Sequence, residues 1–361
     1  MNDNVTLTVN NKDYAGWKSV RIEVGLERIA RSFELSVTEY WPGSTDGARR
    51  ITPGDLVEIR IGDDLVCTGY VDATPIDYDA QSITIMINGR SKTADLVDSS
   101  ADVSGGQFKN LSAEAIAKKL ADPYSLLVVS EVATGTALTD HQIQQGETAF
   151  ESLDRIAKQR QILITDNENG DVVLAAPGSS GTAYDTLVLG ENILSGSAGF
   201  DFTDVYSAYT VKGQKSGTDD SFAKNTAESS GTAVDSNVKR HRVLVVRQSG
   251  QADNATCQQR AAYEQQVRRA KTSEVRYRVV GWHQSNGALW TRNTTVNVID
   301  QIMALNTALL ISEVIYTLDE SGEITELVVI PPTAFTTEPE TKAKAKKRKK
   351  SDQGPDMSWM D

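Results

Sequence analysis

The feature that most constrains this chain is the alternation of apolar and polar residues in many short segments. Apolar side chains occupy every second position in four segments, residues 20–24, 57–61, 83–87 and 275–279. A period of two places these side chains on one face of a β-strand, so one face is buried and the other faces water. Turn-forming residues at 166–171 and 319–322 predict hairpins between further strands. The sequence therefore predicts a mainly β protein made of antiparallel sheets or barrels.

Helical periodicity is confined to three segments. Residues 111–120 and 148–160 carry apolar side chains on one face, and Thr148 and Glu151 have the spacing of a capping box. These two helices lie close together in the sequence. Residues 99–178 are therefore predicted to form a small α/β unit between two β-rich regions.

The third helical segment runs from residue 253 or 254 to about 271 and is rich in alanine and glutamine. Its Tyr263, Val267 and Ala270 share one face. We expect this helix to pack across a sheet.

The two β-rich regions are similar in layout. In the first, Pro53-Gly54 precedes strands near residues 57, 71 and 83, and in the second, Arg292-Asn293 precedes strands near residues 296, 314 and 327. The steps are 14 and 12 residues in the first region and 18 and 13 in the second. Because any two antiparallel meanders can look alike, the spacing leaves duplication and chance as equal alternatives.

The charge balance restricts the partners of the chain. Its 361 residues, enough for two or three domains, carry 37 basic and 49 acidic side chains, a net charge of −12. Without residues 336–361 there are 30 basic and 44 acidic side chains, a net charge of −14. An acidic surface repels phosphate, so we do not expect specific nucleic-acid binding by the body of the protein.

Nothing in the sequence predicts export or membrane insertion. The longest runs of Val, Leu and Ile have four residues, and the N-terminus lacks a basic head and an apolar stretch. Cys67 and Cys257 lie 190 positions apart with no partner pattern around them. We therefore expect a soluble protein made in a cytoplasm, with no membrane span and no disulfide framework.

The strongest local bias is a basic tail after residue 341. Its basic residues are Lys342, Lys344, Lys346, Lys347, Arg348, Lys349 and Lys350. One interpretation is a disordered, solvated tail, and the other is an arm that binds an acidic partner or nucleic acid. No aromatic residues are interleaved with the charges, so base stacking is not indicated.

No catalytic, cofactor or metal site is predicted. His141, His241 and His283 are isolated and surface-like, with no second ligand at metal-binding spacing. Residues 166–171 fit a hairpin turn better than a calcium loop, which would need a glycine at its sixth position. Serine–glycine pairs lack the flanks of a nucleophile elbow. We therefore expect no small-molecule substrate and no enzymatic activity.

Two tryptophans near the C-terminal region predict packing rather than ligand binding. Trp282 and Trp290 flank Ser285-Asn286-Gly287, a spacing typical of a hairpin. Because an indole normally buries a large apolar area, both side chains are expected in a core or an interface.

Several stretches, taken in order, carry a family resemblance. The most specific is GRSKTADLVD at residues 89–98, continuing to SGGQFKN at 104–110. The others are residues 16–20, 32–37, 66–72, 187–192, 209–213, 281–282, 289–290 and 331–335. Together they resemble the baseplate hub protein of Mu-like contractile-tailed bacteriophages, in order over nearly the whole chain up to residue 335. The tail differs in detail, so the resemblance implies nothing about its role.

The resemblance implies a homotrimeric structural protein of the virion tail baseplate, assembled in the bacterial host cytoplasm. Each subunit would be similar to those of the trimeric hubs of other contractile tails and of type VI secretion spike proteins. Each subunit would carry two related β-barrel tube domains, residues 1–98 and 179–335. Residues 99–178 would be the intervening α/β domain and 336–361 a flexible basic tail. Part of 179–213, such as residues 204–212, would return to complete the first barrel.

The implied role is symmetry matching. Three chains with two barrels each would present six docking surfaces to the six-fold tail tube protein and keep a three-fold axis for the central spike protein. Other baseplate proteins would be further partners. The alternatives are a tail-associated cell-wall hydrolase that acts during penetration and a receptor-binding adhesin. The first would need spare length for a catalytic module, and the second an exposed aromatic platform.

Overall fold

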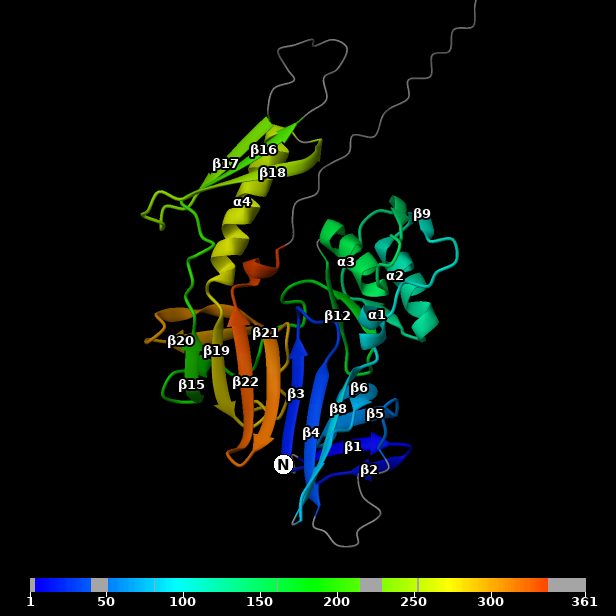
Figure 1. Cartoon of the computed structure of the whole chain (residues 1–361). Helices are drawn as coiled ribbons and strands as arrows, with labels where there is room; N and C mark the ends of the chain where they lie inside the picture. The colour runs from blue at the N-terminus through cyan, green and yellow to red at the C-terminus, as the bar shows by residue number, and fades with distance from the viewer. Residues whose placement is uncertain are drawn as a thin grey trace, which may run out of the picture.

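The computed structural model describes residues 4–39, 51–80, 82–160, 162–214, 229–251 and 253–336. Strands predominate, which confirms the expected mainly β fold. Fourteen strands form one large sheet, and two smaller units lie above it in Figure 1, one on each side.

The first half of the large sheet comes from the N-terminal residues. Its strands are β1 (Val5–Val9), β2 (Lys12–Tyr14), β3 (Ser19–Gly25), β4 (Ser32–Glu39), β5 (Leu56–Ile61), β6 (Asp64–Ala73), β7 (Ile76–Tyr78) and β8 (Ile83–Ser91). The hydrogen-bonded order is β3-β4-β8-β6-β5-β1-β2, with β7 on β8. The alternation predicted at residues 20–24 and 57–61 is confirmed, because Val20, Ile22, Val57 and Ile59 are all buried.

The second half comes from C-terminal residues. Its strands are β14 (Leu187–Val188), β15 (Ile193–Ala198), β19 (Val275–Val280), β20 (Thr295–Asp300), β21 (Leu305–Asp319) and β22 (Gly322–Ile330), followed by a 3-10 turn (Pro332–Phe335). The order is β15-β19-β22-β21-β20-β14. Trp282 and Trp290 are buried in this half on a hairpin between β19 and β20, as predicted.

The two halves have the same strand order. β3, β4, β8, β6, β5 and β1 correspond in turn to β15, β19, β22, β21, β20 and β14, and the order of the strands along the chain corresponds as well. Neighbours are antiparallel in both halves, except that β14 pairs with β20 in parallel. This identity of topology favours duplication over chance.

The register repeats with the topology. Val71 pairs with Gly89 and Ile311 with Val329, and both β6 and β21 then skip one residue in a bulge before Ala73 and Glu313. These equivalent residues are separated by 240 positions. Spacing in the sequence instead matches residue 71 with residue 314, which differs from the observed register by three residues, because spacing locates a strand but does not fix its register.

Both halves surround one hydrophobic core. Buried residues from β1 through β22 belong to a single cluster, and in Figure 1 β1, β2 and β5 cross the upright β3 and β4, while β20 crosses β21 and β22. Across the described residues the hydrogen-bonded order does not return on itself, because β2 and β15 remain its ends. The sheet therefore curls without closing into a hydrogen-bonded barrel.

Residues 94–175 form the unit above the first half (Figure 1). It contains α1 (Ala94–Asp98), β9 (Gln107–Leu111), α2 (Ala113–Ala121), a 3-10 turn (Asp122–Tyr124), β10 (Val128–Ser130), β11 (Leu138–Gln142), α3 (Ala149–Arg160), β12 (Leu163–Asp166) and β13 (Val172–Ala175), around its own core. The capping box is confirmed: Thr148 N–H donates to Glu151 Oε2 at 2.9 Å, and Glu151 N–H donates to Thr148 Oγ1 at 3.1 Å.

A second small unit interrupts the second half between β15 and β19. It consists of β16 (Ala208–Gln214), β17 (Ser229–Val234), β18 (Val243–Gln251) and α4 (Asn254–Lys271). Residues 179–213, part of which the resemblance assigns to the first barrel, supply β14 and β15 to the second half and β16 to this unit. In the described part of the chain, none of these three strands pairs with the first half.

Helix α4 crosses a sheet, as predicted. The contact with the three-stranded sheet uses Cys257 and Ala261 against Val211, rather than the predicted face. Gly231 lies so close to α4 that a Cβ there would be 2.2 Å from the backbone N of Gln258. Of the predicted face, Ala270 is buried, and it packs on the turn after β22.

Candidate functional site: a buried arginine–aspartate junction

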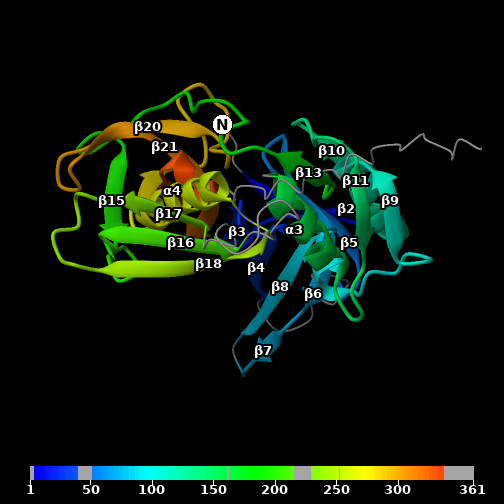
Figure 2. The same ribbon diagram turned by 90° about the horizontal axis from the view of Figure 1, so that it is seen from above.

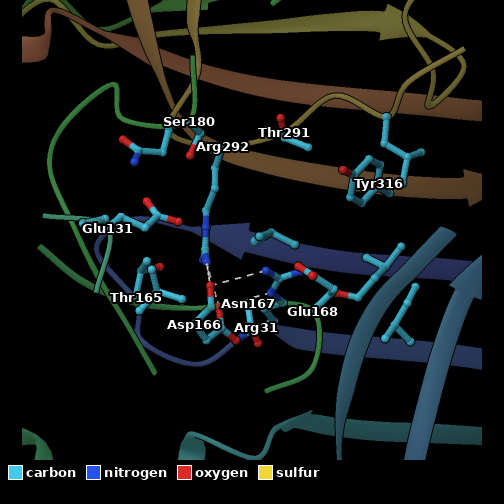
Figure 3. A pocket seen from close by; sticks show the side chains of 17 residues that line it. Arg31, Glu131, Thr165, Asp166, Asn167, Glu168, Ser180, Thr291, Arg292 and Tyr316 are labelled. Carbon is cyan, nitrogen blue, oxygen red and sulfur yellow. Dashed lines mark hydrogen bonds and ion pairs between the residues drawn. The ribbon is translucent and has the colours of Figure 1, made fainter. Parts of the chain in front are cut away.

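The most concentrated set of buried charges lies where the two halves and the α/β unit meet. Arg31 follows β3, Asp166 ends β12, and Arg292 precedes β20, so each of the three parts contributes one residue. All three side chains are buried. They line a cavity of about 280 Å³, in which Figure 3 shows the two guanidinium groups converging on the carboxylate.

The carboxylate of Asp166 accepts hydrogen bonds from both arginines. Arg31 Nε donates to Asp166 Oδ1 at 3.1 Å, and a terminal nitrogen of Arg292 donates to the same oxygen at 2.9 Å. The same Arg292 nitrogen also donates to the Asp166 carbonyl oxygen. Charge-assisted bonds of this kind are among the stronger contacts in a protein, and burial strengthens them further.

Each arginine also binds backbone of the first half. Arg31 Nη1 donates to the Val66 carbonyl at 2.6 Å, and Arg292 Nη1 donates to the Gly25 carbonyl at 2.8 Å. Arg292 belongs to the second half, so its contacts connect all three parts of the fold. The junction therefore fixes the position of the α/β unit relative to both halves of the sheet.

The next residue, Asn293, extends the junction to the linker after β13. Its backbone has φ = 61°, and its side chain accepts from Gly178 N–H at 2.7 Å and donates to the Ala176 carbonyl at 3.0 Å. The equivalent turn in the first half contains Gly54, also with positive φ. Gly54 N–H donates to Val71 O and Asn293 N–H to Ile311 O, each at 2.8 Å, so the duplicated turn is conserved in geometry between the halves.

The surroundings of the junction determine its protonation. Burial lowers the pKa of Arg292 to about 10, against the opposing effect of Asp166, so the side chain stays charged at neutral pH. Burial also acts to lower the pKa of Arg31, but Asp166 and neighbouring groups more than offset it, and the pKa is raised. Burial raises the pKa of the neighbouring Cys67 thiol to about 12, so this thiol is protonated. The junction is thus a stable set of charges that holds structural units together.

The histidines were predicted to be isolated and surface-like, and for His141 the second part is wrong. His141 is buried in the α/β unit, where Nε2 lies 2.9 Å from Ser152 Oγ and the ring stacks on Phe108. Its burial lowers its pKa, with a contribution from Arg155. Within the described ranges, no group of three or more His, Cys, Asp or Glu side chains is placed to hold a metal ion.

The sequence indicated no role for Asp166 beyond its place at a hairpin. The hairpin is present, since β12 pairs with β13 and Asn167 N–H donates to Asp171 O. The only available signal was an aspartate two residues after the apolar run 162–164. The seven basic residues of the tail, Lys342 to Lys350, lie outside the described residues.

Family models match three parts of the chain. Residues 4–91 match "Mu phage baseplate assembly protein GpP-like, N-terminal", and 253–338 match "Mu phage baseplate assembly protein GpP, fourth domain". Residues 93–176 match "Baseplate hub protein gp44-like, second domain". The chain is also 36% identical to the baseplate hub protein gp44 of Escherichia phage Mu, over 99% of this chain and 95% of that protein.

Solved structures with the same fold are phage tail proteins and secretion components. The 43 kDa tail protein of prophage MuSo2 from Shewanella oneidensis has a TM-score of 0.84 at 31% identity, covering 92% of this chain and 99% of that chain. A type VI secretion component of E. coli, described as structurally similar to T4 tail proteins gp27 and gp5, has a TM-score of 0.55 at 9% identity, covering 93% and 79%. The second likeness concerns the fold alone.

The fold and these relatives together identify a structural component of a phage tail. The relatives are named as hub and tail proteins rather than enzymes, and the junction offers contacts instead of a reactive group. The chain belongs to the gp44-like baseplate hub family of Mu-like phages. Its place is therefore the tail of the virion. No helix in the described part of the chain is long and apolar enough to span a membrane.

Proposed function

We propose that this hub protein is a homotrimer that joins the six-fold tube of a contractile tail to a three-fold central spike. The single observation that carries the proposal is the repeated strand order of the two halves, down to the shared bulge. A closed assembly must offer an equivalent surface to each partner subunit. Three chains with two equivalent halves offer six surfaces on one side and retain true three-fold symmetry on the other.

In this proposal each half is one β-barrel tube domain whose curvature is completed in the assembly. The domains are 1–98 and 179–335, with the α/β domain 99–178 at the periphery and the tail 336–361 free to contact an acidic partner. The partners are the tube protein, the spike protein and other baseplate proteins, and assembly takes place in the host cytoplasm. The arginine–aspartate junction supports this role, because it holds the peripheral domain rigidly against both tube domains.

Light scattering combined with electron microscopy tests the proposal. The purified protein should have a mass near three times 39.2 kDa, and averaged end views should show six lobes around a three-fold axis. A protein that stays monomeric at high concentration, or a ring with another number of chains, contradicts it. Clear lysis in a zymogram on peptidoglycan would instead favour the hydrolase alternative.

A further inference from the structure

The two halves of one chain are joined by a strand pair whose counterpart is missing. β3 of the first half pairs antiparallel with residues 313–318 of β21 in the second half. The counterpart of β3 is β15, and the counterpart of residues 313–318 is the segment 73–78, which contains β7. Among the described residues, no strand pairs with the outer edge of either β7 or β15.

Pairings within each half identify which residues are equivalent. Tyr316 pairs with Thr325 and Ile76 with Ile85, so β7 and β21 are related by the same 240 positions as the strands beside them. For β3 and β15 the pairing is traced across two strands. Ile22 pairs with Phe33, which pairs with Gly89. Likewise, Ala198 pairs with Val275, which pairs with Val329. Since Gly89 and Val329 are equivalent, Ile22 and Ala198 are equivalent too.

The observed pairing therefore predicts the missing one. Within the chain, Val20, Arg21 and Ile22 lie opposite Leu318, Thr317 and Tyr316. Transferred to the equivalent residues, Gly196, Ser197 and Ala198 lie opposite Tyr78, Asp77 and Ile76.

Apolar side chains on these two edges are exposed where their counterparts are buried. Ile76 is 49% exposed and Tyr78 is 81% exposed, whereas Tyr316 at the position equivalent to Ile76 is 3% exposed. Phe200 is 49% exposed, and its counterpart Val24 is 6% exposed. Tyr316 and Val24 belong to the hydrophobic core at the edge where β3 and β21 pair, so the exposed edges have the composition of surfaces that a partner strand covers.

The backbone of β7 is also oriented for pairing. Pro75 O accepts from Met86 N–H, and Asp79 N–H donates to Ser82 O, so alternate residues from 75 to 79 bond toward β8. In an antiparallel strand, the residues between them direct N–H and C=O to the opposite edge. Ile76 and Tyr78 therefore present free donors and acceptors outward, at the positions equivalent to Tyr316 and Leu318.

We propose that β7 of one chain pairs antiparallel with β15 of a second copy of this chain, with Asp77 opposite Ser197. This inference rests on the proposed trimer and specifies its interface. The contact is head-to-tail, so β7 of the second copy is free to bind β15 of a third. Pairing within a chain and pairing between chains then alternate around the ring, and the three-chain ring leaves neither edge exposed.

A disulfide across the predicted pair tests the register. Leu26 N–H donates to Ser312 O, so in the internal pair Arg21 and Thr317 form a non-hydrogen-bonded site, where Cα atoms are about 4.5 Å apart. The variant Asp77→Cys with Ser197→Cys copies that geometry between chains and fits a disulfide. Both native cysteines are buried, and Figure 2 shows β7 and β15 well apart within one chain.

The control is the out-of-register variant Asp77→Cys with Ser195→Cys. A shift of two residues separates the Cα atoms by roughly 8 Å, beyond the reach of a relaxed disulfide. After mild oxidation, non-reducing electrophoresis of the in-register variant should give dimer and trimer bands and no higher species. The control should remain at the monomer position, with at least tenfold less cross-linked product.

The outcomes separate this interface from the proposed trimer. A trimeric mass by light scattering without a cross-link refutes the strand pairing and leaves the trimer standing. A covalent ladder that continues beyond the trimer supports the pairing but refutes the three-chain ring. A monomeric protein without a cross-link refutes both.

A charge substitution provides an independent measurement. Tyr78→Lys alters a side chain that is already exposed, so the monomer should fold normally, while the trimer should dissociate at a protein concentration at least tenfold higher than for the unaltered chain. Leu127→Lys is the matched control, because Leu127 is equally apolar and 68% exposed, but on the α/β unit. Equal mass profiles for both variants would overturn the proposed edge.

Discussion

Replacement of Asp166 by alanine should be the most damaging single change in the polar interior of this protein. The carboxylate is the shared partner of Arg31 and Arg292, and all three groups are buried. The substitution leaves two guanidinium groups in the interior without a counter-charge, although their bonds to the Val66 and Gly25 carbonyls remain. Removing one partner of a buried ion pair costs about 3–5 kcal/mol.

Urea unfolding followed by tryptophan fluorescence measures this loss, because Trp282 and Trp290 are buried in the second half. With a slope of about 3 kcal/mol per M of urea, the midpoint should fall by roughly 1–1.7 M. Asp98→Ala is the control, since its ion pair with Arg90 is largely exposed and worth about 0–1 kcal/mol. If the Asp166 and Asp98 variants unfold at the same urea concentration, the junction does not hold the three parts together.

Three further predictions concern the unit of β16 to α4 and the thiol of Cys67. Burial acts to raise the pKa of Glu264, but its bonds to Arg268 and Arg260 outweigh this and lower it. Its stabilising effect is therefore complete above pH 4.5 and lost as the pH falls below it, so Glu264→Gln should weaken the pH dependence of thermal unfolding between pH 5 and 3. Gly231→Ala should separate β17 from α4, because the added Cβ meets helix backbone. The amide protons of α4 should then exchange faster with solvent, and unchanged protection of these protons would contradict the close packing. Cys67, whose pKa burial raises to about 12, should resist a thiolate-selective reagent at pH 8 until urea is added, and rapid labelling of the native protein would refute its burial.

The strands and helices that depend on local patterns were predictable from the sequence. Alternation located β3, β5, β8 and β19, because a strand with one wet face must place every second side chain in the core. The capping box located the start of α3, since its two hydrogen bonds join residues only three positions apart. Such interactions are complete within a short segment, so they produce a pattern that can be recognised in the sequence.

The duplication was only partly predictable. The later strands of each half follow one another at similar spacing, and this similarity was visible. In the second half β15 and β19 are separated by the unit of β16 to α4, while their counterparts β3 and β4 are joined by a short loop. An insertion changes spacing without changing topology, so the equivalence of β3 and β15 could be recognised only from strand pairing.

The sequence by itself determined that this chain is mainly β and acidic, and its ordered family motifs indicated a phage hub protein. The tertiary structure alone decided that Asp166 meets two arginines distant in sequence, and that no strand among the described residues pairs with the outer edges of β7 and β15. The physical reason is the range of the interactions. Periodicity and capping act between near neighbours, whereas a buried ion pair and a sheet edge are defined by groups that only folding brings together.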